Sequence, residues 1–270
     1  MTFANPGAGA LSYFPCRYGN SKLLFRGPKR ALDRPYCAMI GGTETYGRFV
    51  ARPFPKLVED DLGLAMVNLG CVNAGLDVFV NDTAVADVAA GAAVTVVQAM
   101  GAQNMSNRFY MVHPRRNDRF LRASAMLKAL YPGVDFTEFH FTRHMLGALK
   151  SHSATAFEIV VAELQMAWQA RMRMLAVRMP GEKILLWLSA GPADVLGEEP
   201  LFITPHMLDT VRPYFSRVVE VRASPAALKE GTEGMIFSEM DAHAAAALPG
   251  PAVHREIADA LTPVLRDLAL

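Results

Sequence analysis

The sequence of 270 residues lacks the features that define several special classes of protein. Its three cysteines, Cys16, Cys37 and Cys71, are odd in number and widely spaced, so they predict neither a disulfide framework nor a zinc site. No apolar run reaches the roughly 18 residues of a membrane helix, and the first residues do not have the pattern of a secretory signal. We therefore expect a soluble, cytoplasmic protein with reduced thiols and no membrane partner.

An excess of charge of one sign is also missing. The chain has 27 Lys and Arg residues against 26 Asp and Glu residues, a formal net charge of +1. This balance gives no global electrostatic reason to expect a nucleic acid or an anionic membrane as partner, although it leaves room for local basic clusters. Hydrophobic residues make up 51% of the chain, which is typical of a well-packed globular protein.

Short apolar segments alternate with helix-like segments along most of the chain, after an irregular lead-in at residues 1–35 that is rich in Gly, Pro and Arg. The pattern predicts strands at 36–40, 65–69, 93–100, 183–189 and 217–221. It predicts helices at 53–62, at 83–90 behind an Asp82 cap, and from residue 251 onward. We expect one α/β domain at 36–270, a flavodoxin-like three-layer α/β/α sandwich on a parallel sheet.

Residues 105–180 interrupt this alternation. They contain a basic loop, helical patterns near 119–130 and 137–149, and a long helix from about 154 to 179. We interpret the segment as a helical insertion between strands of the sheet, which either covers the site or forms a homo-oligomer contact. The methionines of the long helix are more commonly core residues than contacts with another subunit.

The segment AMIGGTETYGRFV, residues 38–50, predicts a strand, a glycine-rich turn and a helix. Its spacing is close to that of a phosphate-binding loop, but Arg48 replaces the lysine and Phe49 the magnesium-binding hydroxyl. Glu44 would also place a negative charge in the anion cradle. The turn is therefore better interpreted as the support of a nucleophile, Thr43, with a simple helix cap at Thr43 as the alternative.

Four segments, in order, resemble blocks of the SGNH, or GDSL-like, hydrolase superfamily. Residues 41–43 (GGT) stand at its first block, Gly70 follows an NLG-type strand as in the second, and 101–104 (GAQN) correspond to the third. Residues 249–265 resemble its closing segment. The resemblance covers the chain up to about residue 105 and again at its last helix. The whole chain also resembles uncharacterised bacterial proteins that share the stretches GGTETYGRF and NRFY-VHPRRNDRF.

The resemblance implies acyl transfer without a cofactor. Thr43 would be the nucleophile, and the Gly70 N–H and the Asn104 amide would stabilise the oxyanion. Thr43 replaces the serine of the superfamily, Gly42 replaces the aspartate of the first block, and Met105 follows the asparagine where the superfamily has aspartate.

The catalytic base has two candidates. His254 lies in the first turn of the last helix, and His243 follows Asp241 with one residue between them, where the superfamily has two. Asp241 would orient the base. As structural alternatives, His254 packs in the core and His243 is a solvated surface residue.

The segment 104–120, NMSNRFYMVHPRRNDRF, is the densest cluster of basic and aromatic residues. At the carboxyl edge of the sheet it would bind an anionic ligand. Its candidate ligand-binding residues are Arg108, Tyr110, His113, Arg115, Arg116 and Arg119. The alternative is that these arginines pair with Asp118, Asp135 or Glu138. His140 and His144 share a helix face but lack a third ligand, so we expect no metal site.

Two functions follow from these patterns. The first is an SGNH-like esterase or acyltransferase acting on an anionic or carbohydrate-type ester. The second is an inactive SGNH-like protein that binds an anionic ligand through its arginines.

Overall fold

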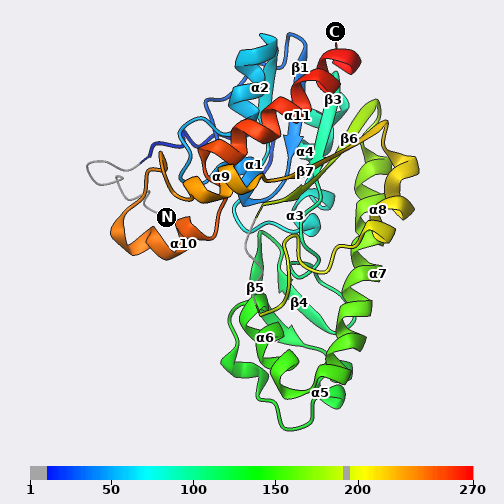
Figure 1. The fold of residues 1–270 in the computed structure, drawn as a ribbon. Helices are drawn as coiled ribbons and strands as arrows, with labels where there is room; N and C mark the ends of the chain where they lie inside the picture. The colour runs from blue at the N-terminus through cyan, green and yellow to red at the C-terminus, as the bar shows by residue number, and fades with distance from the viewer. Residues whose placement is uncertain (1–10, 191–194, 270) are drawn as a thin grey trace.

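The computed structural model describes residues 11–190 and 195–269. Its centre is a parallel sheet of five strands in the order β2-β1-β3-β6-β7. Figure 1 shows this sheet between its helices. The strands are β1 (Tyr36–Ile40), β2 (Ala65–Asn68), β3 (Val94–Gln98), β6 (Glu182–Ser189) and β7 (Arg217–Arg222). Each predicted strand is present within one or two residues of its expected bounds, and the predicted α/β fold on a parallel sheet is confirmed.

Both faces of the sheet are covered, which explains why its strands are continuous apolar runs. All five residues of β1 are buried. Cys37 and Met39 belong to one hydrophobic cluster, while Ala38 and Ile40 belong to the cluster on the opposite face. The alternation of side chains along a strand therefore divides β1 between two cores.

Helices form the two outer layers (Figure 1). One face packs against α2 (Phe54–Leu62), α9 (Pro225–Glu230) and α11 (Pro251–Ala269). The other packs against α3 (Leu76–Val80), α4 (Thr83–Ala90), α7 (Ala154–Arg178) and α8 (Pro205–Val211). Asp82 caps α4 as predicted, because its side chain accepts a hydrogen bond from the Val85 N–H. None of the helices in the described ranges has both the length and the apolar character to cross a membrane.

The segment 105–180 differs from the expected loop and helices. Its basic part is an antiparallel hairpin of β4 (Tyr110–His113) and β5 (Arg116–Ala123), followed by α5 (Ala125–Leu130). The helix expected near 119–130 starts only at Ala125, because 116–123 pair with β4 and Ser124 caps α5. The helix expected near 137–149 is divided into η1 (Phe136–Glu138) and α6 (Thr142–His152). In Figure 1 the hairpin, α5 and α6 lie beyond the sheet, beside the first turns of α7.

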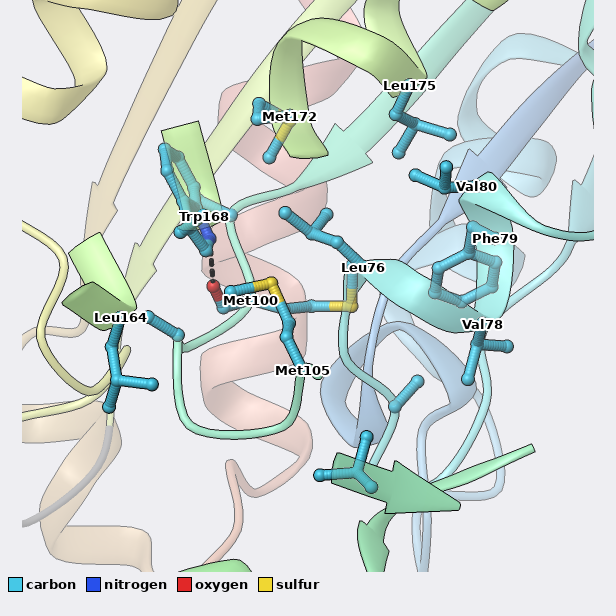
Figure 2. Close-up of a cluster of buried hydrophobic side chains, with 14 of the residues drawn as sticks. Leu76, Val78, Phe79, Val80, Met100, Met105, Leu164, Trp168, Met172 and Leu175 are labelled. Carbon is cyan, nitrogen blue, oxygen red and sulfur yellow. Dashed lines mark hydrogen bonds between the residues drawn. The ribbon is translucent and has the colours of Figure 1, made fainter. Parts of the chain in front are cut away.

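The long helix α7 connects this segment to the sheet. Trp168 is fully buried, and its Nε1 donates a hydrogen bond of 2.7 Å to the Met100 carbonyl, just after β3 (Figure 2). Met172 is buried in the same cluster, whereas Met166 and Met174 are exposed. The methionines of α7 are thus divided between core and surface, and a homo-oligomer contact stays a prediction.

The remaining elements are short. They are α1 (Thr43–Tyr46), η2 (Arg212–Tyr214), η3 (Glu239–Asp241) and α10 (Ala242–Ala246). The described part of the lead-in, residues 11–35, has no regular helix or strand but is closed by an antiparallel bridge between Cys16 and Phe25. Residues 1–10 lie outside the described ranges, and the domain bounds stay a prediction.

Candidate functional site

A cavity of about 670 Å³ lies at the carboxyl edge of the sheet. From β1 the chain moves outward to β2 and then returns to the other side of β1 as β3. Such a reversal of strand order is where open α/β sheets bind ligands. The walls include Thr43 after β1, Asn73 after β2, Asn104 after β3 and His243 on α10.

Thr43 is the first residue of α1 and does not cap it. The cap position is Gly42, and no side chain makes the capping hydrogen bond there. The Thr43 hydroxyl instead accepts a hydrogen bond of 2.9 Å from the Asn73 N–H and donates one of 3.3 Å to Asn73 Oδ1. The helix-cap interpretation of Thr43 is therefore wrong, and its hydroxyl belongs to the cavity.

Gln98, at the end of β3, holds the turn that carries Thr43. Its Oε1 accepts hydrogen bonds from the Gly42 N–H at 3.0 Å and the Thr45 hydroxyl at 2.7 Å. Its Nε2 donates to Glu44 Oε2 at 2.8 Å. A Cβ at Gly41 would lie 2.5 Å from Gln98 Oε1, so this contact requires a glycine at the first position of the turn.

Asn73 and Asn104 form the polar wall beside the Thr43 hydroxyl. Asn73 adopts a left-handed backbone conformation with φ of 55°. Asn104 Nδ2 donates to the Asn73 carbonyl at 3.1 Å, and Asn104 Oδ1 accepts from the Thr142 hydroxyl at 2.7 Å. A carbonyl can only accept a hydrogen bond, so the Asn73 carbonyl fixes which end of the Asn104 amide faces it. Among the described residues, only one of the two N–H groups of the Asn104 amide has an acceptor.

Gly70 is not part of this wall. Its N–H donates to Asn68 Oδ1 at 2.9 Å, and it does not line the cavity. A Cβ on Gly70 would lie 2.3 Å from the Tyr46 nitrogen, so the glycine is needed for the close approach of the β2 loop to α1. The backbone N–H that bonds to the Thr43 hydroxyl belongs to Asn73, three residues after Gly70. Asn73 was not among the site residues predicted from the sequence.

The two candidate histidines have different environments. His254 is 1% exposed, stacks on the Phe54 ring and accepts a hydrogen bond of 3.0 Å from the Phe54 N–H at its Nδ1. Burial, and secondarily the charge of Arg26, lowers the pKa of His254 to about 3. His254 is therefore a neutral core residue away from the cavity, whereas His243 is exposed and lines it.

The expected pair of Asp241 and His243 is not formed. Asp241 accepts a hydrogen bond from Ser238 and forms an ion pair with Arg48 at 3.0 Å. Within the described ranges the structure records no hydrogen bond from Thr43 to His243. The cavity thus brings together Thr43, Asn104 and His243, and leaves Gly70, His254 and the Asp241 carboxylate outside its lining.

The cavity contains three carboxyl groups that were not predicted as site residues. Glu44 is half-buried, and burial raises the pKa of its carboxyl above the usual value, opposed by the hydrogen bond from Gln98. Asp118 accepts a hydrogen bond of 3.2 Å from Asn73 Nδ2. Glu199 forms an ion pair with Arg143 at the wall. The walls therefore present acceptors for the hydroxyl groups of a ligand.

The six basic-loop candidates separate into two groups. Arg108 forms an ion pair with Glu163, and Tyr110 is buried with its hydroxyl on the Gln103 carbonyl. Neither lines the Thr43 cavity. The other four, His113, Arg115, Arg116 and Arg119, line a second cavity of about 710 Å³. No group of three potential metal ligands occurs in the part of the chain that the structure describes.

A family model described as "Domain of unknown function (DUF6473)" matches residues 1–269. The chain belongs to this family. No curated protein matches the DUF6473 chain.

Two solved structures are similar to the DUF6473 chain. One is a family two carbohydrate esterase from Clostridium thermocellum in complex with cellohexaose, with 11% identity and a TM-score of 0.43 over 91% of this chain and 67% of the other. The second is a protein from Lactobacillus plantarum, with 14% identity and a TM-score of 0.44 over 87% and 98% of the two chains. Likenesses this distant carry no argument about activity.

Proposed function

We propose that this DUF6473 protein is an esterase or acyltransferase with Thr43 as its nucleophile. The observation that carries the proposal is that Thr43, the Asn104 amide and His243 line one cavity. Acyl transfer requires a nucleophilic hydroxyl, a donor for the oxyanion and a general base, and these three residues could supply them. The order of the GGT, NLG and GAQN segments, which resembles the SGNH superfamily, supports the same chemistry.

In the proposed reaction the Thr43 oxygen attacks the ester carbonyl and forms a tetrahedral intermediate. The second N–H of the Asn104 amide would bind the oxyanion, and the Asn73 N–H could join it only by leaving the Thr43 oxygen to which it now donates. Each such donor is typically worth about 3 to 4 kcal/mol. The C–O bond of the leaving alcohol then breaks and leaves the acyl group on Thr43. Water, or an acceptor alcohol, releases that acyl group and restores the hydroxyl.

His243 is the proposed base. It would take the Thr43 proton and return it to the leaving alcohol. Since the Thr43 hydroxyl bonds to Asn73, the proposal requires α10 to bring His243 to the hydroxyl when substrate is bound. Hydrogen bonds of catalytic groups are often incomplete in the absence of substrate.

The walls favour a neutral, hydroxyl-rich substrate over an anionic one. Glu44, Asp118 and Glu199 are carboxyl groups, and the cations Arg48 and Arg143 are already paired with carboxylates. An anionic substrate would meet net repulsion there, whereas sugar hydroxyls could donate to these oxygens. The exposed ring of Phe141 offers an apolar face for a sugar ring. We therefore favour an O-acylated carbohydrate.

The test is hydrolysis of an aryl acetate and of an acetylated sugar by the purified chain. We expect Thr43→Ala and His243→Gln each to reduce kcat/KM by about 100-fold or more. Thr43→Ser should retain activity, because it keeps the hydroxyl and removes the hindering β-methyl group. His254→Asn is the matched histidine control. It removes an imidazole outside the cavity, so its folded fraction should retain kcat.

Covalent labelling provides a second measurement. A fluorophosphonate should transfer its phosphonyl group to Thr43 Oγ with release of fluoride, which mass spectrometry locates. Labelling that is unchanged in Thr43→Ala would contradict the proposed nucleophile.

Binding without turnover is the second candidate function. The pairing of Asp241 with Arg48 and the hydrogen bonds of Thr43 to Asn73 favour it. Binding without turnover would replace the esterase proposal under two conditions. The wild-type chain would hydrolyse no ester and take no label, and an acetylated sugar would still raise its melting temperature.

A further inference from the structure

The second cavity is lined by seven basic residues. Two segments far apart in the sequence supply them. The lead-in contributes Arg17 and Lys22, while the β4–β5 hairpin and the residues after it contribute His113, Arg115, Arg116, Arg119 and His140. The lining contains no carboxylate among the described residues. In a chain with a net charge of only +1, this is a strong local concentration of positive charge.

Among the described residues, the arginines of this cavity lack the carboxylate partners that usually explain such clusters. Of the acids expected to pair with them, Asp135 caps η1 and Asp118 accepts from Asn73. Within the described ranges, no ion pair involves Arg17, Lys22, Arg115, Arg116 or Arg119. Arg108 just before the hairpin is the contrast, since it is paired with Glu163.

Both segments that carry these cations are held in place. The Cys16–Phe25 bridge closes the lead-in loop with two hydrogen bonds of 3.0 Å, and Ser21 anchors it through Asp82 at 2.7 Å. The hairpin turn is fixed by His113 Nδ1, which accepts from two consecutive backbone N–H groups at 3.2 Å. The Arg119 guanidinium stacks on the Phe141 ring, 4.5 Å from its centre. The backbone segments that carry the cations, and the Arg119 guanidinium, are thus held in place by the protein itself.

We propose that this cavity binds a small organic molecule that carries two or more phosphate or sulfate groups. The cations come from two segments that are far apart in the sequence, and their number suits separated anionic groups better than a single carboxylate. A volume of about 710 Å³ suits a small ligand. Leu23, Leu24 and Leu121 in the lining offer contact to an apolar portion of it. A concave site in a nearly neutral chain favours a small polyanion over a nucleic acid, which needs an extended basic surface.

The site is distinct from the Thr43 cavity. Cys71 and Val72 line the basic cavity, while the next two residues, Asn73 and Ala74, line the Thr43 cavity. Burial raises the pKa of Cys71 to about 12, so its thiol is neutral and does not oppose an anion. A binding measurement at the basic cavity therefore tests this proposal independently of ester hydrolysis.

The experiment is calorimetric titration of the full chain with inorganic triphosphate, with adenosine triphosphate and with a disulfated disaccharide as probes. We expect the double variant Arg115→Ala/Arg116→Ala to weaken binding by about tenfold or more. The reason is that each arginine removed takes away a charge-assisted hydrogen bond to the anion, which is stronger than a hydrogen bond between neutral groups. Arg17→Ala/Lys22→Ala should weaken it similarly from the other segment. The matched control, Arg222→Ala/Arg266→Ala, removes the same charge from exposed positions outside the cavity and should change Kd by less than about twofold.

The relative affinities of the phosphate and sulfate probes identify the anion. The proposal is overturned if no probe binds, or if the control weakens binding as much as the cavity variants. It is also overturned if affinity for a duplex DNA increases with its length and exceeds that for every small probe. Circular dichroism of each variant checks that the fold is retained. If the Arg115→Ala/Arg116→Ala variant unfolds, the Arg17→Ala/Lys22→Ala variant still tests the proposal.

Discussion

Gln98 offers the sharpest test of how the candidate nucleophile is held. Replacing it with leucine removes the acceptor of the Gly42 N–H and of the Thr45 hydroxyl, in a residue that is 5% exposed. Each buried donor left without a partner costs about 1 to 3 kcal/mol. The variant should therefore lose about 2 to 6 kcal/mol of unfolding free energy, measured by urea denaturation. Thr95→Val on the same strand is the control, because its hydroxyl makes only a 3.4 Å bond.

The substitution Gln98→Glu keeps the hydrogen-bond acceptor at this position but removes the N–H donor. A carboxylate can still accept both hydrogen bonds of the turn, but it would face Glu44 Oε2, to which Gln98 now donates. At low pH the two carboxyl groups can share a proton, while at high pH both are ionised and repel each other. The stability of Gln98→Glu relative to wild type should thus fall as pH rises. The reasoning is refuted if this difference is independent of pH, or if Gln98→Leu costs no more than Thr95→Val.

Three further predictions use the same measurement. Burial raises the pKa of Glu44 in the folded state, so Glu44→Gln should be more stable than wild type at neutral pH, and this gain should vanish below the unfolded pKa of 4.5. Burial lowers the pKa of His254 to about 3 against 6.5 unfolded, so wild type should lose about 3 kcal/mol between pH 6.5 and 4. His254→Asn, which offers Phe54 another acceptor, should lack this loss. Trp168→Phe should cost about 1 to 3 kcal/mol, because the Met100 carbonyl loses its donor; a cost equal to that of the exposed Met166→Leu would contradict this.

The sheet could be predicted because its strands are buried on both faces and flanked by turn signals. The hairpin could not, because half of the β5 residues (RNDRFLRA) are exposed and its few apolar residues do not alternate with polar ones as in a half-buried strand. Its structure depends on pairing with β4 and on Asn117, which is fully buried and bonds to two backbone N–H groups of the β2–α3 region. Long-range pairing of this kind leaves no periodic signal in the sequence.

Residues of the Thr43 cavity were predicted from the sequence only where they belong to a recognisable motif. The motif identified Thr43 and Asn104, but it could not identify Gln98, whose role depends on contacts between β3 and α1. A signal was present, since Gln98 is an amide side chain at the carboxyl end of a buried strand. For His254 the helical spacing was informative as well. Ile257, Ala258 and Leu261 follow it at three, four and seven residues, which places His254 on the buried stripe of α11.

The net charge of +1 conceals a separation of charge that the fold creates. Asp118 and Arg119 are adjacent in β5, and successive side chains of a strand point to opposite faces. Asp118 therefore lines the Thr43 cavity, while Arg119 lines the basic cavity. The sequence presents them as neighbours that would neutralise each other, as in a structural ion pair. Because the two side chains line different cavities, each cavity keeps its own electrostatic character, as the two proposals, a neutral ester in one cavity and a polyanion in the other, require.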